Sequence, residues 1–296
     1  MSIKCPYCSS PFLTSASRKK KSIISFGFFL RKSDQTRCAR FFCKPCKKHF
    51  SIATFQACYY QKKRNLNSTL FHLLVSGVSQ RRSALILSID RKTVVRKFIF
   101  LGHFAEALLK HQKFHSNPIS QMQFDDLESF EHTKLKPISV ILAVENKTRK
   151  ILGFRVAKMP AKGLLAKKAL KKYGPRADER KKARRDLFAE LKPLIHEKAL
   201  IESDENPHYV KDVKEFFSTA THRVFKGQRG CVVGQGELKA VGYDPLFSLN
   251  HTFAMLRANI NRLFRKTWNT TKKPERLKLH INLYTLYHNH FLILKT

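Results

Sequence analysis

The stretch Gln121–Phe130, QMQFDDLESF, decides the fold of this chain because it opens three consecutive strand patterns. Two apolar runs, Ile138–Val144 and Ile151–Val156, follow it with only a polar turn between them. Short apolar runs bounded by polar turns predict β-strands. The three segments therefore predict a meander, and its first strand carries the adjacent acids Asp125 and Asp126.

A second acid follows an apolar run further along the chain. Ala199–Ile201 leads through Glu202 to Asp204, after which Asn206–Phe217 has the pattern of a helix and 222–225 that of a short strand. Alternating strands and helices predict an α/β fold. Asp204 is expected at the carboxyl end of a strand just before a helix, where such sheets place functional side chains.

The last long helix is predicted over Leu249 to about Trp268. Asn250 and Arg257 are seven residues apart in it, so both project from one side, near the sheet. Two aspartates from separate strands and a polar helix residue have the oxygen ligands to hold two Mg²⁺ ions about 3.5–4 Å apart, as in enzymes that attack phosphodiesters in line. The alternative is that Asp125 and Asp204 are a solvated surface acid and a helix cap.

The charge of the chain points to a polyanionic partner. Its 296 residues include 58 Lys and Arg against 21 Asp and Glu, a formal net charge of +37. This excess favours nucleic acid as partner, and 43% hydrophobic residues exclude a disordered basic tail. The longest apolar run, Ile23–Leu30, is far shorter than the ~20 residues of a membrane helix. We expect no membrane partner and no signal peptide.

The cysteines predict a metal site. Cys5–Cys8 and Cys43–Cys46 are two CxxC pairs separated by 34 residues, a spacing typical of four thiolates around a structural Zn²⁺. Short strands are expected between the pairs, at Ile23–Leu30 and Arg40–Phe42, as in a ribbon. The alternative is two pairs of free or redox-active thiols. Cys38 is a substitute ligand, while Cys58 and Cys231 fit core positions.

A helix-turn-helix pattern follows the cysteines. Apolar positions between Leu70 and Ile99 fit three short amphipathic helices, and Asp90 is the expected N-cap of the third. A recognition helix touches DNA with its first turn. That turn holds Arg91, Lys92 and Thr93, and the residues expected to contact phosphates are Arg81, Arg82, Arg96 and Lys97.

These patterns divide the chain into parts. We expect a zinc ribbon over 1–60, a helix-turn-helix domain over 65–112, a linker over 113–121 and a catalytic domain over 122–296. A basic helical insertion is expected in the last part, around 160–198.

The motifs together resemble a bacterial insertion-sequence transposase of the DDE type, and the resemblance covers nearly the whole chain. The segments that carry it are CPYC (5–8), RFFCKPCKKHFS (40–51), GVSQRRSALILSIDRKTVVRK (77–97), FDDLESFE (124–131), IESDENPHYVKDVKEFF (201–217) and LNHTFAMLRANINRLFRKTW (249–268). The resemblance implies an RNase H-like mixed sheet flanked by helices. It also implies that the ribbon and helix-turn-helix bind terminal inverted repeats of double-stranded DNA.

By this resemblance Asp125 is the first catalytic carboxylate, with Asp126 as its rival, and Asp204 is the second. The triad would use Mg²⁺ or Mn²⁺ to expose a 3′-hydroxyl and join it to target DNA. Where the family usually has a glutamate, this chain has Asn250, seven residues before Arg257. Glu237 and Asp244 are the substitutes if a carboxylate is required.

Further basic side chains, Arg262, Arg265 and Lys266, are expected to line the DNA track beyond Arg257. Trp268 is available for base or sugar stacking, but a partly buried side chain is the favoured expectation. The resemblance implies a homodimer or higher oligomer on DNA, in the bacterial cytoplasm at the nucleoid. The alternative function is a catalytically inactive, transposase-derived DNA-binding protein.

Overall fold

The computed structural model describes residues 3–10, 22–113, 118–226, 244–264 and 267–293. The chain divides into two compact units, 1–69 and 70–296. The expected linker over 113–121 lies inside the second unit, so the proposed separation of a helix-turn-helix domain from a catalytic domain stays a prediction.

The first unit contains a three-stranded antiparallel sheet in the order β1-β2-β3. Its strands are β1 (Ile23–Arg31), β2 (Thr36–Cys43) and β3 (Lys48–Ser51), and a short 3₁₀ turn, η1 (Ile52–Phe55), follows. Phe41 and Phe50 are opposite each other on β2 and β3 and stack over a small core with Ile23. The two strands expected between the cysteine pairs are therefore confirmed.

The second unit is built on a mixed five-stranded sheet in the order β6-β5-β4-β7-β8. Its strands are β4 (Ile119–Phe130), β5 (Pro137–Glu145), β6 (Ile151–Lys158), β7 (Ile195–Asp204) and β8 (Thr221–Phe225). Strands β4, β5 and β6 pair antiparallel, which confirms the meander, while β7 runs parallel to both β4 and β8.

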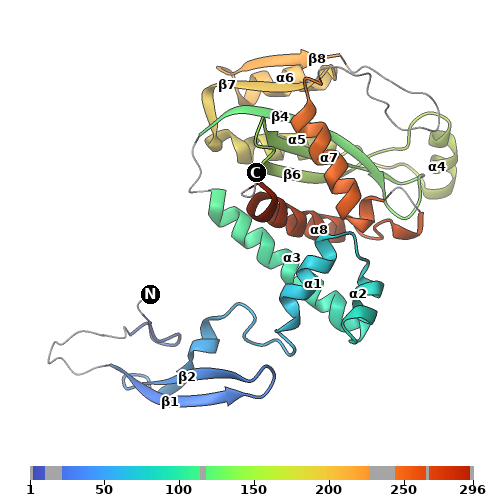
Figure 1. Ribbon diagram of the computed structural model, residues 1–296. Coiled ribbons are helices and arrows are strands. Elements are labelled where there is room, and N and C mark those ends of the chain that lie inside the picture. The colour runs from blue at the N-terminus through green and yellow to red at the C-terminus, as the bar shows by residue number, and fades with distance from the viewer. Residues whose placement is uncertain (1–2, 11–21, 114–117, 227–243, 265–266, 294–296) are drawn as a thin grey trace. The chain divides into compact units, whose positions relative to one another are not determined.

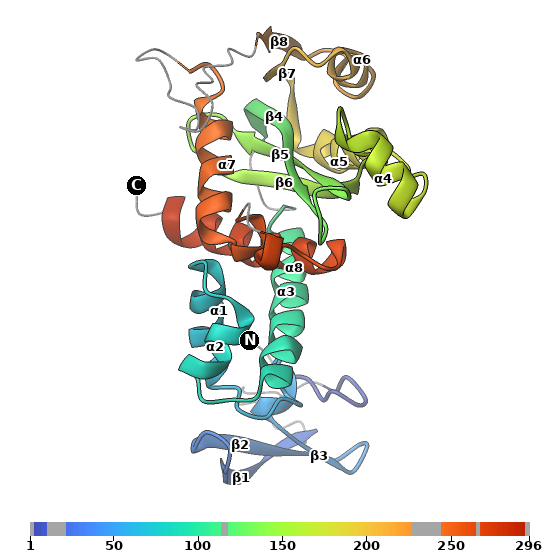
Figure 2. The ribbon, with the colours of Figure 1, turned by 90° about the vertical axis from the view of Figure 1, so that its right-hand side faces the viewer.

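Helices flank both faces of this sheet (Figure 1). The helices are α1 (Leu66–Val75), α2 (Gln80–Ile86), α3 (Arg91–Lys113), α4 (Leu165–Tyr173), α5 (Arg180–Leu191), α6 (Pro207–Phe216), α7 (Phe247–Asn259) and α8 (Pro274–Tyr287). Figure 2 shows α7 on one side of the sheet and α5 on the other. The expected basic insertion contains α4 and α5.

The two faces of β4 follow the strand period of two. Leu127 packs into the core that contains α3, α7 and α8. Phe124 points the other way, into the core of α5 and α6, where Phe188 and Tyr209 surround its ring with centroids 4.9 Å away.

The third of the three N-terminal helices differs from the short helix that was predicted. Helix α3 runs for 23 residues because it lies along α8 and buries a stripe that includes Phe98 and Ala105. The expected N-cap is confirmed, since Asp90 Oδ1 accepts the Lys92 amide at 2.7 Å. Lys97 is only 4% exposed, so its predicted phosphate contact is wrong.

The final helix is shorter than predicted. Helix α7 ends at Asn259, whose side-chain amide donates to the Met255 carbonyl at 2.9 Å. Ile260 leaves the helical conformation with φ −103° and ψ 103°, and both it and Leu263 turn into the core. The chain therefore leaves the helix here, and these apolar side chains are buried in the core. No helix of the described ranges is long and apolar enough to span a membrane.

Candidate active site

The two acids of the predicted site lie on neighbouring strands. Strands β4 and β7 pair in parallel, and the last pair is Gln123 with Glu202. Asp125 and Asp204 each lie two residues beyond that pair, and side chains two apart share one face of a sheet. The pairing register therefore places both aspartates on the sheet face that carries α7, and the charge of Asp204 acts on Asp125.

Burial and mutual repulsion disfavour two charges at this position. Burial, and secondly the charge of Asp204, raises the pKa of Asp125 to about 7. Burial, and secondly the charge of Glu205, also raises the pKa of Asp204. The charge of Asp204 therefore opposes ionisation of Asp125. Two acids that repel each other in a half-buried setting are a natural position for a divalent cation.

The structure separates Asp125 from its neighbour. Asp125 pairs with Leu142 on the face of the α7 core, whereas Asp126 pairs with Ile141 on the face of the α5 core. Burial raises the pKa of Asp126, while the charge of Arg184 opposes that rise. Only Asp125 of the two shares its face with Asp204.

Each acid of the pair has a local hydrogen bond. Tyr209 of α6 donates its hydroxyl to Asp125 Oδ1 at 3.0 Å. The backbone amide of Asn206 donates to Asp204 Oδ1 at 3.2 Å, and Asn206 in turn caps α6. The start of α6 therefore contacts both acids.

A buried polar network that sequence reasoning missed ties α7 to the sheet. Glu202 Oε2 accepts Gln123 Nε2 and Asn146 Nδ2, each at 2.9 Å. Gln123 also donates to the Pro245 carbonyl at 2.8 Å and accepts the Leu249 amide at 3.1 Å. Both Gln123 and Glu202 precede a site acid by two residues. The strand period alone therefore signals that they share its face.

Asn250 lies in the first turn of α7, next to this network. Its side-chain amide donates to both carboxylate oxygens of Asp244, at 3.3 and 3.1 Å. The Asp244 carboxylate, one of the two proposed substitutes, therefore contacts Asn250. Glu237, the other substitute, lies outside the described residues. Arg257 is half-buried in the last turn of the same helix.

Most of the predicted DNA-contacting residues on α2 and α3 face solvent. The exposed side chains are Arg81, Arg82, Arg91, Lys92 and Arg96, and Thr93 is half-buried. Ser79 caps α2 by accepting the Arg82 amide at 3.2 Å. The basic residues are accessible to a polyanion, and DNA reading by these helices stays a prediction.

Arg262 lies beyond the end of α7 and does not continue its helix. Arg262 lies over the Phe98 ring at 5.4 Å, and burial lowers its pKa to about 10. Arg265 and Lys266 lie outside the described residues. Trp268 is 76% exposed, so the prediction of a partly buried side chain is wrong.

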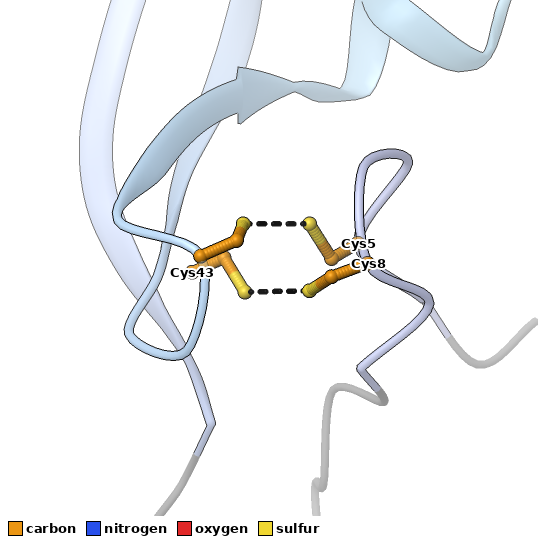
Figure 3. Close-up of side chains that lie close together, drawn as sticks. Cys5, Cys8 and Cys43 are labelled. Atoms are coloured by element: carbon orange, nitrogen blue, oxygen red, sulfur yellow. Dashed lines mark hydrogen bonds between the residues drawn. The ribbon is translucent and has the colours of Figure 1, made fainter.

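The two CxxC pairs come together in the first unit. Cys5 Sγ lies 3.6 Å from Cys46 Sγ and Cys8 Sγ lies 3.4 Å from Cys43 Sγ. Figure 3 shows the side chains of Cys5, Cys8 and Cys43 pointing toward one another. All four sulfur atoms lie within 4.8 Å of one another. Four sulfurs at 2.3 Å from a tetrahedral zinc ion are ~3.8 Å apart. The cluster therefore fits a four-thiolate metal site.

The remaining sulfur and imidazole groups lie elsewhere. Cys38 is buried in β2, and its thiol donates a hydrogen bond to the Thr36 carbonyl. His280 and His288 are buried and bond to the Leu74 and Arg149 carbonyls. In the described ranges, the four cysteines are the only group of three or more His, Cys, Asp or Glu side chains with metal-ligand geometry. Cys231 lies outside them.

A scan against protein-family models and a search of curated proteins found no match. Among solved structures, the chain is similar to the catalytic domain of Mos1 mariner transposase, at 15% identity over 66% of this chain and 92% of that chain, with a TM-score of 0.26. A likeness of this degree does not define the activity of the chain.

Proposed function

We propose that this protein is a metal-dependent DNA transposase that cleaves element ends and joins them to target DNA. The observation that carries the proposal is the placement of Asp125 and Asp204 on neighbouring strands, where burial and the charge of Asp204 raise the pKa of Asp125. The net charge of +37 supports a polyanionic substrate. The sequence motifs resemble transposases of the DDE type.

The residues of the chain have separate tasks in this reaction. Asp125 and Asp204 supply carboxylate oxygens for Mg²⁺ or Mn²⁺, the ligand type these cations prefer. The bound cation would activate a water or a 3′-hydroxyl and neutralise charge on the scissile phosphate. Glu202 and Gln123 hold the start of α7 against the sheet, which keeps Asn250 and Asp244 at this edge.

The third ligand is proposed to come from the start of α7. The Asn250 amide nitrogen donates to Asp244, which orients the amide oxygen away from that carboxylate. An amide oxygen is a neutral ligand and holds a cation more weakly than a carboxylate does. Asn250→Glu should therefore lower the Mg²⁺ concentration required for half-maximal rate.

Ends of the element would be held by the basic helices and the first unit. The exposed Arg91 and Lys92 at the first turn of α3 support insertion of that turn into the major groove. We propose zinc as the ion of the four-thiolate site, where it would stabilise the β1-β2-β3 sheet. We also propose that the protein acts as a dimer or higher oligomer on paired ends.

The test is a cleavage and joining assay with the full chain, Mn²⁺ and duplexes carrying the flanking ends of the coding region. We expect wild type to nick and join, Asp204→Asn to lose at least 100-fold in rate, and both to bind DNA equally. Glu197→Gln, an exposed acid on the same strand, is the matched control and should stay active. Equal rates for wild type and Asp204→Asn would refute the proposal.

The second candidate is a DNA-binding protein without chemistry, which the neutral Asn250 favours. It predicts tight, salt-dependent binding to the same ends with no metal-dependent cleavage by wild type or by Asn250→Glu.

A further inference from the structure

The surroundings of Tyr209 point to a role behind the acid pair. Tyr209 lies in the first turn of α6 and is 1% exposed, with its ring packed on Phe124 on the α5 side of the sheet. Its hydroxyl nevertheless bonds Asp125, which belongs to the opposite face. The pairing of β4 with β7 ends at Gln123 and Glu202, so Tyr209 reaches Asp125 just beyond the last paired residues.

A buried ion pair supports the ring of Tyr209 from behind. The Arg184 guanidinium lies over that ring, 4.9 Å from its centroid. Arg184 Nε donates to Asp212 Oδ2 at 2.7 Å, and a second guanidinium nitrogen, Nη2, donates to the same oxygen. Arg184 and Asp212 are 3% and 2% exposed. This buried ion pair has two hydrogen bonds, and breaking it would leave an unpaired charge in the protein interior. The pair is therefore a rigid support.

The sequence spacing explains why these groups meet. Tyr209 and Asp212 are three residues apart and share one face of α6. Arg184 and Phe188 are four apart and share the facing side of α5, where Phe188 packs edge-on against Phe124. The ion pair and the aromatic cluster therefore dock α6 on α5 in one register.

We propose that Tyr209 is a positioning residue that orients the first metal-binding carboxylate, Asp125, with Arg184 and Asp212 fixing the tyrosine. This inference rests on the proposed function of the acid pair. The Tyr209 hydroxyl holds the rotation of the Asp125 carboxyl group through its hydrogen bond to Oδ1. Hydrogen bonds to metal-ligating carboxylates orient the ligands, and their loss costs 10–100-fold in metal affinity or activity.

The test compares Tyr209→Phe with wild type in the zinc-loaded full chain. Phenylalanine keeps the ring on Phe124 and under Arg184 and removes only the hydroxyl. We expect Mn²⁺ affinity by calorimetry to fall at least 10-fold, the strand-cleavage kcat to fall by a similar factor, and DNA affinity to stay within twofold. Tyr284→Phe is the matched control, since Tyr284 is equally buried but belongs to α8.

The outcomes separate this inference from the proposed function. Wild-type Mn²⁺ affinity and cleavage rate in Tyr209→Phe would overturn the positioning role while leaving the transposase proposal intact. If wild type binds Mn²⁺ but cleaves no duplex, the transposase proposal fails, and the change in Mn²⁺ affinity still decides the role of Tyr209. A wild-type protein that binds no Mn²⁺, with Asp204→Asn behaving identically, overturns both.

Discussion

Gly102 of α3 and Leu279 of α8 approach so closely that no side chain fits between them. A Cβ atom at position 102 would lie 2.7 Å from Leu279 Cβ and 3.2 Å from the Leu279 carbonyl oxygen. Glycine is otherwise unfavourable within a helix. Its presence in the middle of α3 therefore has a packing reason, because it lets the longest described helix lie along α8.

The helix contact predicts the effect of Gly102→Ala. The added methyl group forces α3 and α8 apart at a cost of about 1–3 kcal/mol, which exceeds the gain in helix propensity. Urea unfolding should show a lower midpoint. Leu279→Ala in the same chain should not restore the midpoint, because alanine keeps the Leu279 Cβ atom and carbonyl oxygen that the new methyl group meets. An unchanged or higher midpoint for Gly102→Ala alone would contradict this packing.

The raised pKa of Asp125 predicts how stability depends on pH when divalent cations are chelated. The folded pKa of about 7 exceeds the ordinary value of 3.8. Between these values the folded state binds more protons, so the free energy of unfolding falls as pH rises from about 4 to 7. The loss is on the order of 4 kcal/mol at most.

Chelated protein unfolded at a series of pH values measures this dependence. Mg²⁺ should restore stability above pH 7, and Asp125→Asn should flatten the profile. A stability that rises over the same pH range, with the slope unaffected by Asp125→Asn, would exclude a half-buried acid pair.

The buried network around Glu202 predicts a structural effect of its removal. Glu202→Ala leaves Gln123 Nε2 and Asn146 Nδ2 without their shared acceptor, at about 1–3 kcal/mol for each group. Urea unfolding should give a loss of roughly 2–6 kcal/mol. Glu197→Gln on the same strand should cost less than about 0.5 kcal/mol, as surface changes do. Similar losses of unfolding free energy for both variants would show that this network does not hold α7 against the sheet.

The four-cysteine cluster predicts one zinc ion per chain by elemental analysis. Cys43→Ser should release the zinc and unfold the first unit, because metal-binding energy is folding energy in small zinc sites. Cys38→Ser, at a thiol outside the cluster, should keep the full metal content. A folded first unit after complete chelation would contradict a structural metal.

Salt dependence of DNA binding should distinguish exposed from half-buried cations. Each neutralised phosphate contributes about −0.9 to the slope of log K against log salt. Arg91→Ala should reduce the slope by about one contact. Arg262→Ala should leave the slope unchanged and lower stability, since Arg262 packs on Phe98. The reverse pattern would place the DNA track beyond α7.

The sequence by itself determined the elements of the sheet and the identity of the candidate ligands. Strand periodicity, the polar turns and the helix cap at Asp90 are local signals, so β4 to β8 and the start of α3 could be predicted with small errors at their ends. The CxxC spacing likewise brings two thiols together within a few residues.

Only the tertiary structure decided which neighbours share a face and which basic residues remain exposed. The pairing of β4 with β5 and β7 puts Asp125, and not Asp126, on the face of Asp204, and α7 ends at Asn259, before Arg262. Lys97 and Trp268 were assigned wrongly because their exposure depends on segments far away in the chain. The contact of Tyr209 with Asp125 depends on the docking of α6 on α5. Long-range pairing and packing, unlike periodicity, produce no pattern in the local sequence.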